Sequence, residues 1–234
     1  MQYASQAVAK PYFVAAIGLF VGQIAQLAGD SRSSAIVKTA ARGRCLLSAE
    51  GLAGDIQADR RAHGGDGKAL HQYPAEHYER LAAAFPDARH LVPGGLGENL
   101  SSRGLTEDDV CIGDIFRIGT ARIQISQPRT PCWKIDHRTG CPGVAAFIAE
   151  HGLAGWYYGV LEAGEIAADD WLDHIERQAS APTLAEFWRV IRAPKPSIES
   201  LLRLAYATGL DAEWTAKLTQ RAEWLRNNPT DNAK

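Results

Sequence analysis

The stretch DIFRIGTARIQISQ, residues 114–127, indicates the fold class of this chain. It contains two short β-like runs, 114–118 and 122–127, separated by a turn that includes glycine. Further runs of this kind occur at residues 22–27 and 156–161, in a part of the chain that is rich in glycine. Short strands joined by turns are typical of β-barrels and β-sandwiches. The sequence therefore predicts a mainly β core.

The composition is that of a folded globular protein. Of the 234 residues, 46% are apolar and 22% are charged, which excludes intrinsic disorder and collagen-like or coiled-coil architecture for the whole chain. A mass of 25.4 kDa suits one large domain, or one domain of ordinary size with a small appendage. The 25 Lys and Arg residues and 27 Asp and Glu residues give a formal net charge of -2, which argues against binding to a nucleic acid polymer.

The longest apolar run, residues 13–21, is about half as long as the ~20 residues that a membrane span needs, and Gly18 interrupts it. No convincing signal-peptide cleavage site follows this run. We therefore expect a cytoplasmic protein without a membrane segment. The cysteines show no C-x-x-C spacing, so we expect neither a disulfide framework nor a structural zinc site.

The composition changes near residues 178–182, where β-like runs give way to helix-like segments. Thr183 and Glu186 form a capping box that opens one helix, Ser197 caps a second, and Asp211 caps a third. We expect an N-terminal extension without an assigned role (1–21), a β domain (22–178) and a small three-helix module (182–228). Two further helices are expected within the β domain, at 74–85 and 142–151.

A glycine-rich loop is the first candidate binding segment. Three glycines lie between His63 and Lys68, so the backbone can approach a ligand closely, and a cation stands at each end of the loop. This arrangement suits a phosphate or another oxyanion. It is not a P-loop, because Ala62 occupies the position of the first glycine and Ala69 that of the hydroxyl residue. An ordinary surface turn is the alternative.

Cys132 is the centre of the second candidate segment, QPRTPCWK, residues 127–134. Arg129 and Lys134 are close to it in sequence, and nearby cations favour the thiolate, which attacks electrophiles, carries sulfur or binds soft metals. Residues 117–138 contain five basic side chains and Asp136 as the one acidic side chain, a net of +4 that indicates an anionic partner. The alternative is a buried, inert cysteine among solvated strand residues.

The third candidate segment is GGLGENL, residues 94–100. Asn99 can donate and accept hydrogen bonds at once, which suits the edge of a heterocycle such as a pterin or purine. A turn in which Asn99 bonds to its own backbone is the alternative. The histidines around these segments fit no metal-ligand spacing.

Taken together and in this order, the three segments resemble the MOSC domain, named for the C-terminal domain of molybdenum cofactor sulfurase. The resemblance is closest to the stand-alone bacterial YiiM-type group, in which a three-helix tail also follows the domain. It covers roughly residues 20–228. The matching motifs are GLAGDIQAD (51–59), HGGDGKAL (63–70), GENL (97–100), GLT (104–106), IGD (112–114) and QPRTPCWK (127–134).

This resemblance implies a MOSC-type β-barrel with peripheral helices and a molybdenum cofactor (molybdenum with molybdopterin). It also implies reduction of N-hydroxylated compounds, such as hydroxylaminopurines and amidoximes, to amines. Cys132 would be the metal ligand and a catalytic residue, and His63 and Glu98 are candidate proton donors. The expected cofactor-binding residues are Arg60, His63, Lys68, Asn99, Arg129 and Lys134. Electrons would come from a separate reductase, because the sequence has no dinucleotide fingerprint and no iron–sulfur cysteine set.

A carrier without turnover is the alternative function. Cys132 would then hold a persulfide, or the protein would deliver the cofactor to another enzyme. The helical tail is open to several interpretations: a lid, a homodimer interface, a docking face for a reductase, or a cover for one end of the barrel.

Overall fold

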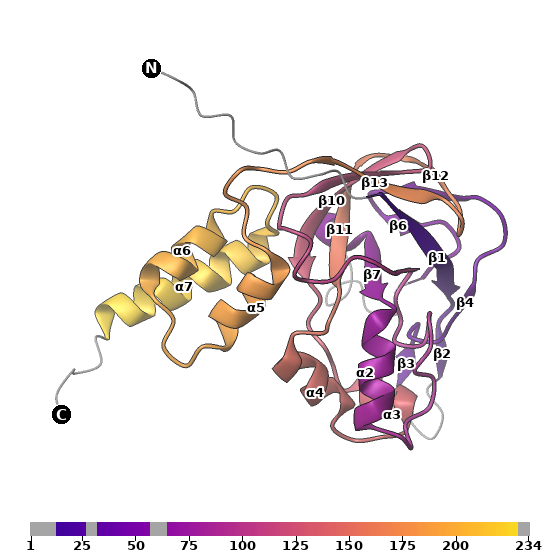
Figure 1. Cartoon of the computed structure of the whole chain (residues 1–234), viewed down its shortest axis with the longest axis horizontal. Helices are drawn as coiled ribbons and strands as arrows, with labels where there is room; N and C mark the ends of the chain where they lie inside the picture. The colour runs from indigo at the N-terminus through magenta and orange to yellow at the C-terminus, as the bar shows by residue number, and fades with distance from the viewer. Residues whose placement is uncertain (1–12, 27–31, 57–64, 229–234) are drawn as a thin grey trace.

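A curled β-sheet forms the centre of the fold. The computed structural model describes residues 13–26, 32–56 and 65–228. Eight strands pair in the order β13-β9-β10-β11-β7-β8-β1-β4, and β1 also pairs with β13, so the sheet curves back on itself (Figure 1). The strands are β1 (Phe13–Gly22), β4 (Lys38–Ala40), β7 (Leu70–Pro74), β8 (Leu100–Ser102), β9 (Ile115–Ile118), β10 (Ala121–Pro128), β11 (Trp156–Glu162) and β13 (Trp171–Glu176).

Two small sheets accompany the large one. Strands β5 (Cys45–Ser48), β6 (Gly51–Leu52) and β12 (Gly164–Ile166) form the first, and β2 (Ala25–Gln26) pairs with β3 (Ser33–Ser34) in the second. The predicted strand at 22–27 is mostly wrong, because β1 already ends at Gly22 and β2 holds two residues. The predicted strands at 114–118, 122–127 and 156–161 are confirmed within a residue or two as β9, β10 and β11.

Helices contribute as many residues as strands, so the fold is mixed α/β and the mainly β prediction is corrected. The helix expected at 74–85 is α2, and that expected at 142–151 is α4. The helical segments are η1 (Asp66–Lys68), α2 (Glu76–Ala84), α3 (Lys134–Thr139), α4 (Val144–His151), α5 (Leu184–Arg192), α6 (Ile198–Ala205) and α7 (Ala212–Asn227). None of those that the structure describes has both the length and the apolar character that crossing a bilayer requires.

Residues 13–21, which the sequence interpretation assigned to an extension without a role, belong to the large sheet. They form most of β1, which pairs with β8 and β13 and, at its carboxyl end, with β4. An apolar run of this length fits a long strand in the middle of a sheet. The described part of the N-terminal segment is therefore a structural element of the sheet.

The three C-terminal helices have the predicted caps. The side chain of Thr183 accepts a hydrogen bond from Glu186 N, that of Ser197 from Ser200 N, and that of Asp211 from Glu213 N. These helices lie together at one side of the sheet (Figure 1). Phe187, Leu204 and Leu218 belong to the same hydrophobic core as residues of the strands. The division into a barrel domain and a separate helical module stays a prediction.

The main core fixes the orientation of two neighbouring strands. Leu70 of β7 and Trp156 and Tyr158 of β11 are completely buried in this core. Because side chains alternate along a strand, His71 and Tyr157 point to the opposite face of the sheet. The two are directly paired in the register of β7 and β11. This face carries the pocket described below.

Candidate functional site

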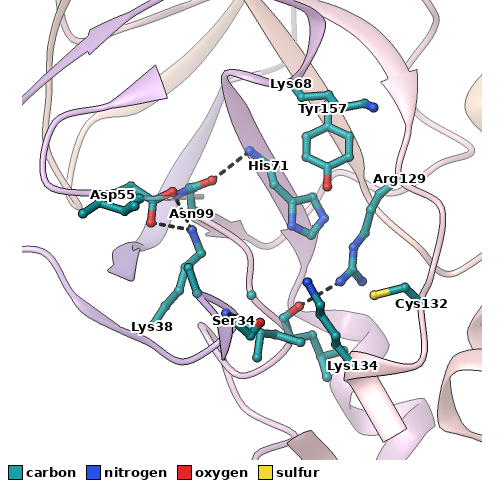
Figure 2. A pocket seen from close by; sticks show the side chains of 15 residues that line it. Ser34, Lys38, Asp55, Lys68, His71, Asn99, Arg129, Cys132, Lys134 and Tyr157 are labelled. Carbon is teal, nitrogen blue, oxygen red and sulfur yellow. Dashed lines mark hydrogen bonds and ion pairs between the residues drawn. The ribbon is translucent and has the colours of Figure 1, made fainter. Parts of the chain in front are cut away.

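A pocket on this face collects residues from segments that are far apart in the sequence (Figure 2). The strands contribute His71 and Tyr157, the glycine-rich loop contributes Lys68, and the segment after β10 contributes Arg129, Cys132 and Lys134. The remaining lining residues are Ser34, Ala35, Ile36, Lys38, Asp55, Ile56, Leu96, Gly97 and Asn99. The three segments singled out in the sequence thus meet at one place.

Cys132 is half-buried and lines the pocket just before α3. Its carbonyl accepts a hydrogen bond from Ile135 N at 3.0 Å, which fixes the turn into the helix. Of the chain's four cysteines, all in described segments, the other three are absent from the pocket lining. Burial raises the pKa of the Cys111 thiol to about 11, so that side chain stays protonated. Cys132 is the thiol that a ligand in the pocket meets.

Arg129 is a buried cation, with 6% of its surface exposed. Its Nη2 donates to the carbonyl of Leu96 at 3.1 Å, and its backbone N–H donates to Gly155 O at 3.1 Å. Its Nη1 is buried and has no hydrogen-bond partner. A guanidinium anchored at one nitrogen and open at another is suited to bind an anion.

His71 is a site residue that the sequence does not point to. Its side chain is buried, its Nε2 has no hydrogen-bond partner, and its ring lies 5.0 Å from that of Tyr157. Burial, reinforced by the charges of Arg129 and Lys38, holds the pKa of His71 well below its ordinary value. The imidazole is therefore neutral at physiological pH. The signal in the sequence is its place one residue after Leu70, which turns it away from the main core.

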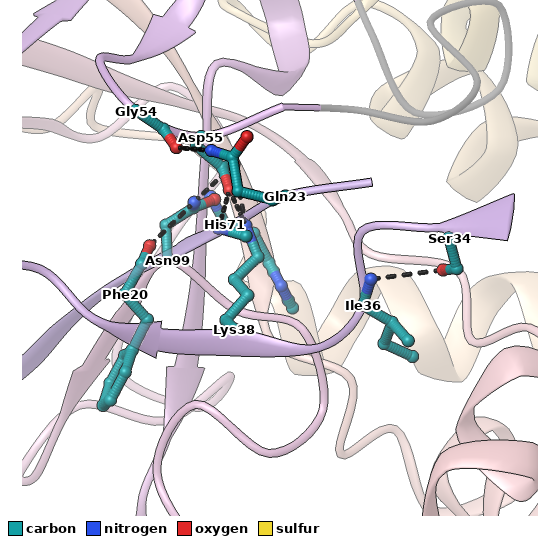
Figure 3. A network of polar contacts seen from close by, with 10 residues as sticks. Phe20, Gln23, Ser34, Ile36, Lys38, Gly54, Asp55, His71 and Asn99 are labelled. Carbon is teal, nitrogen blue, oxygen red and sulfur yellow. Dashed lines mark hydrogen bonds and ion pairs between the residues drawn. The ribbon is translucent and has the colours of Figure 1, made fainter. Parts of the chain in front are cut away.

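Asp55, Lys38 and Asn99 form a buried polar network at one wall of the pocket (Figure 3). Asp55 accepts from Lys38 Nζ at 2.7 Å, from Asn99 Nδ2 at 2.8 Å and from Gly22 N at 2.6 Å. Burial lowers the pKa of Lys38 although the carboxylate of Asp55 opposes this shift. Asp55 and Lys38 were not singled out from the sequence, because they meet through the fold.

Asn99 lines the pocket as expected, but its amide is engaged by the protein. Its Nδ2 donates to Phe20 O at 3.2 Å as well as to Asp55, and its Oδ1 accepts from His71 N at 3.2 Å. Both amide hydrogens are used in these contacts. The contacts of Asn99 are thus those of a residue that holds β1, β7 and Asp55 together, and its role as a reader of a heterocycle stays a prediction.

The pocket lining carries an excess of positive charge. It contains four basic side chains, Lys38, Lys68, Arg129 and Lys134, and one carboxylate, Asp55. Lys68 also reaches the helical tail, because its Nζ lies 3.6 Å from Glu213 Oε2 in α7. Of the five basic residues in the 117–138 window, Arg117 and Arg122 instead pair with Asp173 and Glu162 on neighbouring strands. The charge of the pocket favours an anionic ligand.

Two other predicted residues, Arg60 and His63, lie outside the described residues. Glu98, a candidate proton donor, is fully buried and is not part of the pocket lining. It accepts hydrogen bonds from Tyr78 OH, from Gly94 N at 2.6 Å and from Leu96 N at 3.1 Å, and burial raises its pKa. These contacts order the 94–98 loop, so Glu98 has a structural role.

The donor set limits how a metal can bind. Within the described ranges, no three His, Cys, Asp or Glu side chains are arranged to hold a metal ion. The pocket supplies one thiol and several cations instead. Such a set suits a metal that arrives with an anionic organic ligand and takes one further ligand from the protein.

Comparisons with known proteins show the family to which the chain belongs. Residues 59–173 match the sequence profile of the MOSC domain. Protein YiiM of Escherichia coli (strain K12) is 38% identical over 206 residues, which cover 88% of this chain and 91% of that protein. The chain belongs to the MOSC-domain family. It is YiiM-like over most of its length.

The solved structures extend the likeness to the fold. The crystal structure of YiiM from Geobacillus stearothermophilus superposes with a TM-score of 0.74 at 29% identity, covering 88% of this chain and 97% of that chain. A protein of Gibberella moniliformis (strain M3125 / FGSC 7600) named "Reductase" is 35% identical over 175 residues, 74% of this chain and 31% of that protein. The MOSC family is associated with the molybdenum cofactor.

Proposed function

We propose that this protein is a molybdenum-cofactor-dependent oxidoreductase that reduces N-hydroxylated compounds, such as hydroxylaminopurines and amidoximes, to amines. The observation that carries the proposal is the juxtaposition, in one cationic pocket, of the Cys132 thiol and the buried Arg129 guanidinium. Membership of a family associated with the cofactor, and a relative named as a reductase, also support it.

The residues of the pocket fit such a cofactor. Arg129 Nη1 and His71 Nε2 are buried polar atoms without protein partners, and a bound ligand can satisfy both. A phosphate suits the basic side chains, and a soft metal suits a single thiolate. In this arrangement Cys132 would be the metal ligand, while Lys68, Arg129 and Lys134 would hold the anionic part. The roles expected of Arg60 and His63, which lie outside the described residues, stay predictions.

Reduction of an N-hydroxyl group is a two-electron reaction: R–NHOH, two electrons and two protons give R–NH₂ and water. When bound, the molybdenum cofactor supplies a two-electron redox centre with affinity for oxygen. The chain's own residues bind the cofactor and orient it in the pocket. Arg129 and the lysines neutralise negative charge, Cys132 fixes the metal, and the Asp55 network keeps the pocket wall in place. A separate reductase returns the two electrons, since the four cysteines lack iron–sulfur spacing.

The test is turnover. Cofactor-loaded protein is reduced with a chemical donor such as dithionite-reduced viologen and is mixed with benzamidoxime, and the amidine is quantified. Amidine formation by the native chain, lost in Cys132→Ser, is expected. No amidine from a protein that carries full molybdenum and pterin contradicts the enzyme proposal and favours the carrier function, in which the cofactor is passed on.

A further inference from the structure

Two buried polar atoms in the pocket have no partner in the protein. They are Nε2 of His71, a residue with 3% of its surface exposed, and Nη1 of Arg129, with 6% exposed. Leaving a buried donor or acceptor unsatisfied is unfavourable, and such atoms are rare in native proteins. Figure 2 shows the imidazole and the guanidinium as neighbours in the same part of the pocket. A ligand that bonds to both atoms removes this cost.

Both side chains are held in place before any ligand arrives. Arg129 is anchored through Nη2 to Leu96 O at 3.1 Å. His71 is fixed by the strand pairing of β7 with β11, and its ring packs against Tyr157 at 5.0 Å. Groups fixed in this way lose little freedom on binding. Asn99, in contrast, already uses both amide hydrogens within the protein.

The charges around His71 indicate the kind of ligand that the ring meets. Arg129 and Lys38 are the charged groups that act on the ring, and both are cations, so an anionic or oxygen-rich ligand is expected there. The neutral imidazole has two tautomers, and the one with its proton on Nε2 donates to such a ligand. Arg129 is a donor in any case. With that tautomer of His71, two donors converge.

We propose that His71, with its proton on Nε2, and Arg129, through Nη1, form a two-donor site that binds one acceptor oxygen of the ligand. This inference rests on the proposed function, and the oxygen has two sources: the phosphate or pterin carbonyl of the cofactor, or the N-hydroxyl oxygen of the substrate. His71 thus becomes a binding residue of the pocket.

The first experiment measures pterin per chain, by fluorescence of the oxidised pterin, after gel filtration of protein from a cofactor-producing host. The variants are His71→Phe, which keeps an aromatic ring without nitrogen, His71→Gln, Arg129→Met and the double variant His71→Phe/Arg129→Met. If the oxygen belongs to the cofactor, His71→Phe and Arg129→Met each lose about tenfold in retention. His71→Gln recovers part of the loss, and the double variant loses less than the product of the single effects.

If retention is unchanged, the KM for benzamidoxime, measured at equal cofactor loading, decides whether the oxygen belongs to the substrate. A rise of about tenfold in His71→Phe and in Arg129→Met assigns the oxygen to the substrate. Unchanged retention and unchanged KM overturn the inference while leaving the proposed function intact. If the effect in the double variant equals the product of the two single effects, the two side chains act independently, and the idea that they share one oxygen is overturned. A native chain that holds no pterin from a cofactor-producing host overturns the inference together with the proposed function.

A control separates binding from folding. His77 is also a buried histidine, but its Nε2 lies 2.6 Å from Glu107 Oε2. In cofactor-free protein, His77→Phe should lower the urea midpoint, because the buried Oε2 of Glu107 loses its partner and only Oε1 keeps one, Gly155 N. His71→Phe should leave the midpoint unchanged or raise it, since an unsatisfied buried atom is removed. A lower midpoint for His71→Phe as well would show that the imidazole serves the fold and would overturn the inference.

Discussion

Lys68 Nζ lies 3.6 Å from Glu213 Oε2, so the glycine-rich loop at the pocket is paired with the first turn of α7. Ser126 of β10 also bridges the two segments. Gly67 O accepts from Ser126 Oγ at 2.5 Å, and Asp211 N donates to Ser126 O at 3.0 Å. A Cβ on Gly67 would stand 2.7 Å from Asp211 Oδ2. The start of α7 thus packs against the loop that holds Lys68.

Glu213→Gln should strengthen retention of an anionic cofactor, because it removes a carboxylate that competes for Lys68. The Glu213 side chain is 57% exposed, so the ion pair contributes less than about 1 kcal/mol to stability, and a gain of up to about fivefold in retention is expected. Lys68→Ala should weaken retention. Glu223→Gln on the same helix is the control of equal charge, and equal effects of the two glutamine variants would contradict the pairing.

Asp55→Asn should destabilise the fold strongly. The side chains of Lys38 and Asp55 are 6% and 8% exposed, and the substitution leaves a buried ammonium without its carboxylate, at a cost of about 3–5 kcal/mol. The free energy of unfolding in urea measures this. Glu79→Gln, which breaks an exposed ion pair with Arg103, is the comparison and should cost less than about 1 kcal/mol. A similarly small loss for Asp55→Asn would mean that the network is weak.

Stability below neutral pH should depend on His71. Its pKa in the folded protein is held well below 6.5, so the unfolded state binds a proton that the folded state does not. The contribution of His71 to stability is therefore complete above about pH 6.5 and is lost as the pH falls. In cofactor-free protein, the native chain should lose up to about 2 kcal/mol of unfolding free energy relative to His71→Phe between pH 7 and pH 5. Parallel pH curves would contradict the neutral imidazole.

Glu98→Gln should affect the fold and not the pocket. One carboxylate oxygen becomes an amide that cannot accept from Leu96 N or Gly94 N, which costs about 1–3 kcal/mol. Pterin per chain in the folded fraction should equal that of the native protein, because Glu98 does not line the pocket. A native-like midpoint with reduced pterin would return Glu98 to the candidate site.

The helices were more predictable than the long strand. A capping side chain bonds to a residue two or three positions away. The local sequence around Thr183, Ser197 and Asp211 therefore predicts the starts of α5, α6 and α7. The β1 strand depends on partners far away, since it pairs with β8 and β13 across most of the chain. Its apolar run alone does not predict a strand of the large sheet, because nothing nearby in the sequence reveals those partners.

The candidate site shows the same difference between local and long-range contacts. Cys132, Arg129 and Lys134 share one segment, and their proximity is visible in the sequence. His71, Lys38 and Asp55 become neighbours only through the curled sheet and the polar network. Their residue types alone gave no reason to group them. Strand alternation around His71 is the one local signal, and it becomes useful once Leu70 is known to face the core.

The most direct test of the central claim is the molybdenum and pterin content per chain of protein purified anaerobically from a cofactor-producing host. Native protein and Cys132→Ser are compared. Near-stoichiometric molybdenum and pterin in the native protein, with the molybdenum lost from Cys132→Ser, is the predicted result. A well-folded native protein without molybdenum or pterin, or a Cys132→Ser variant that keeps both in full, would contradict the account.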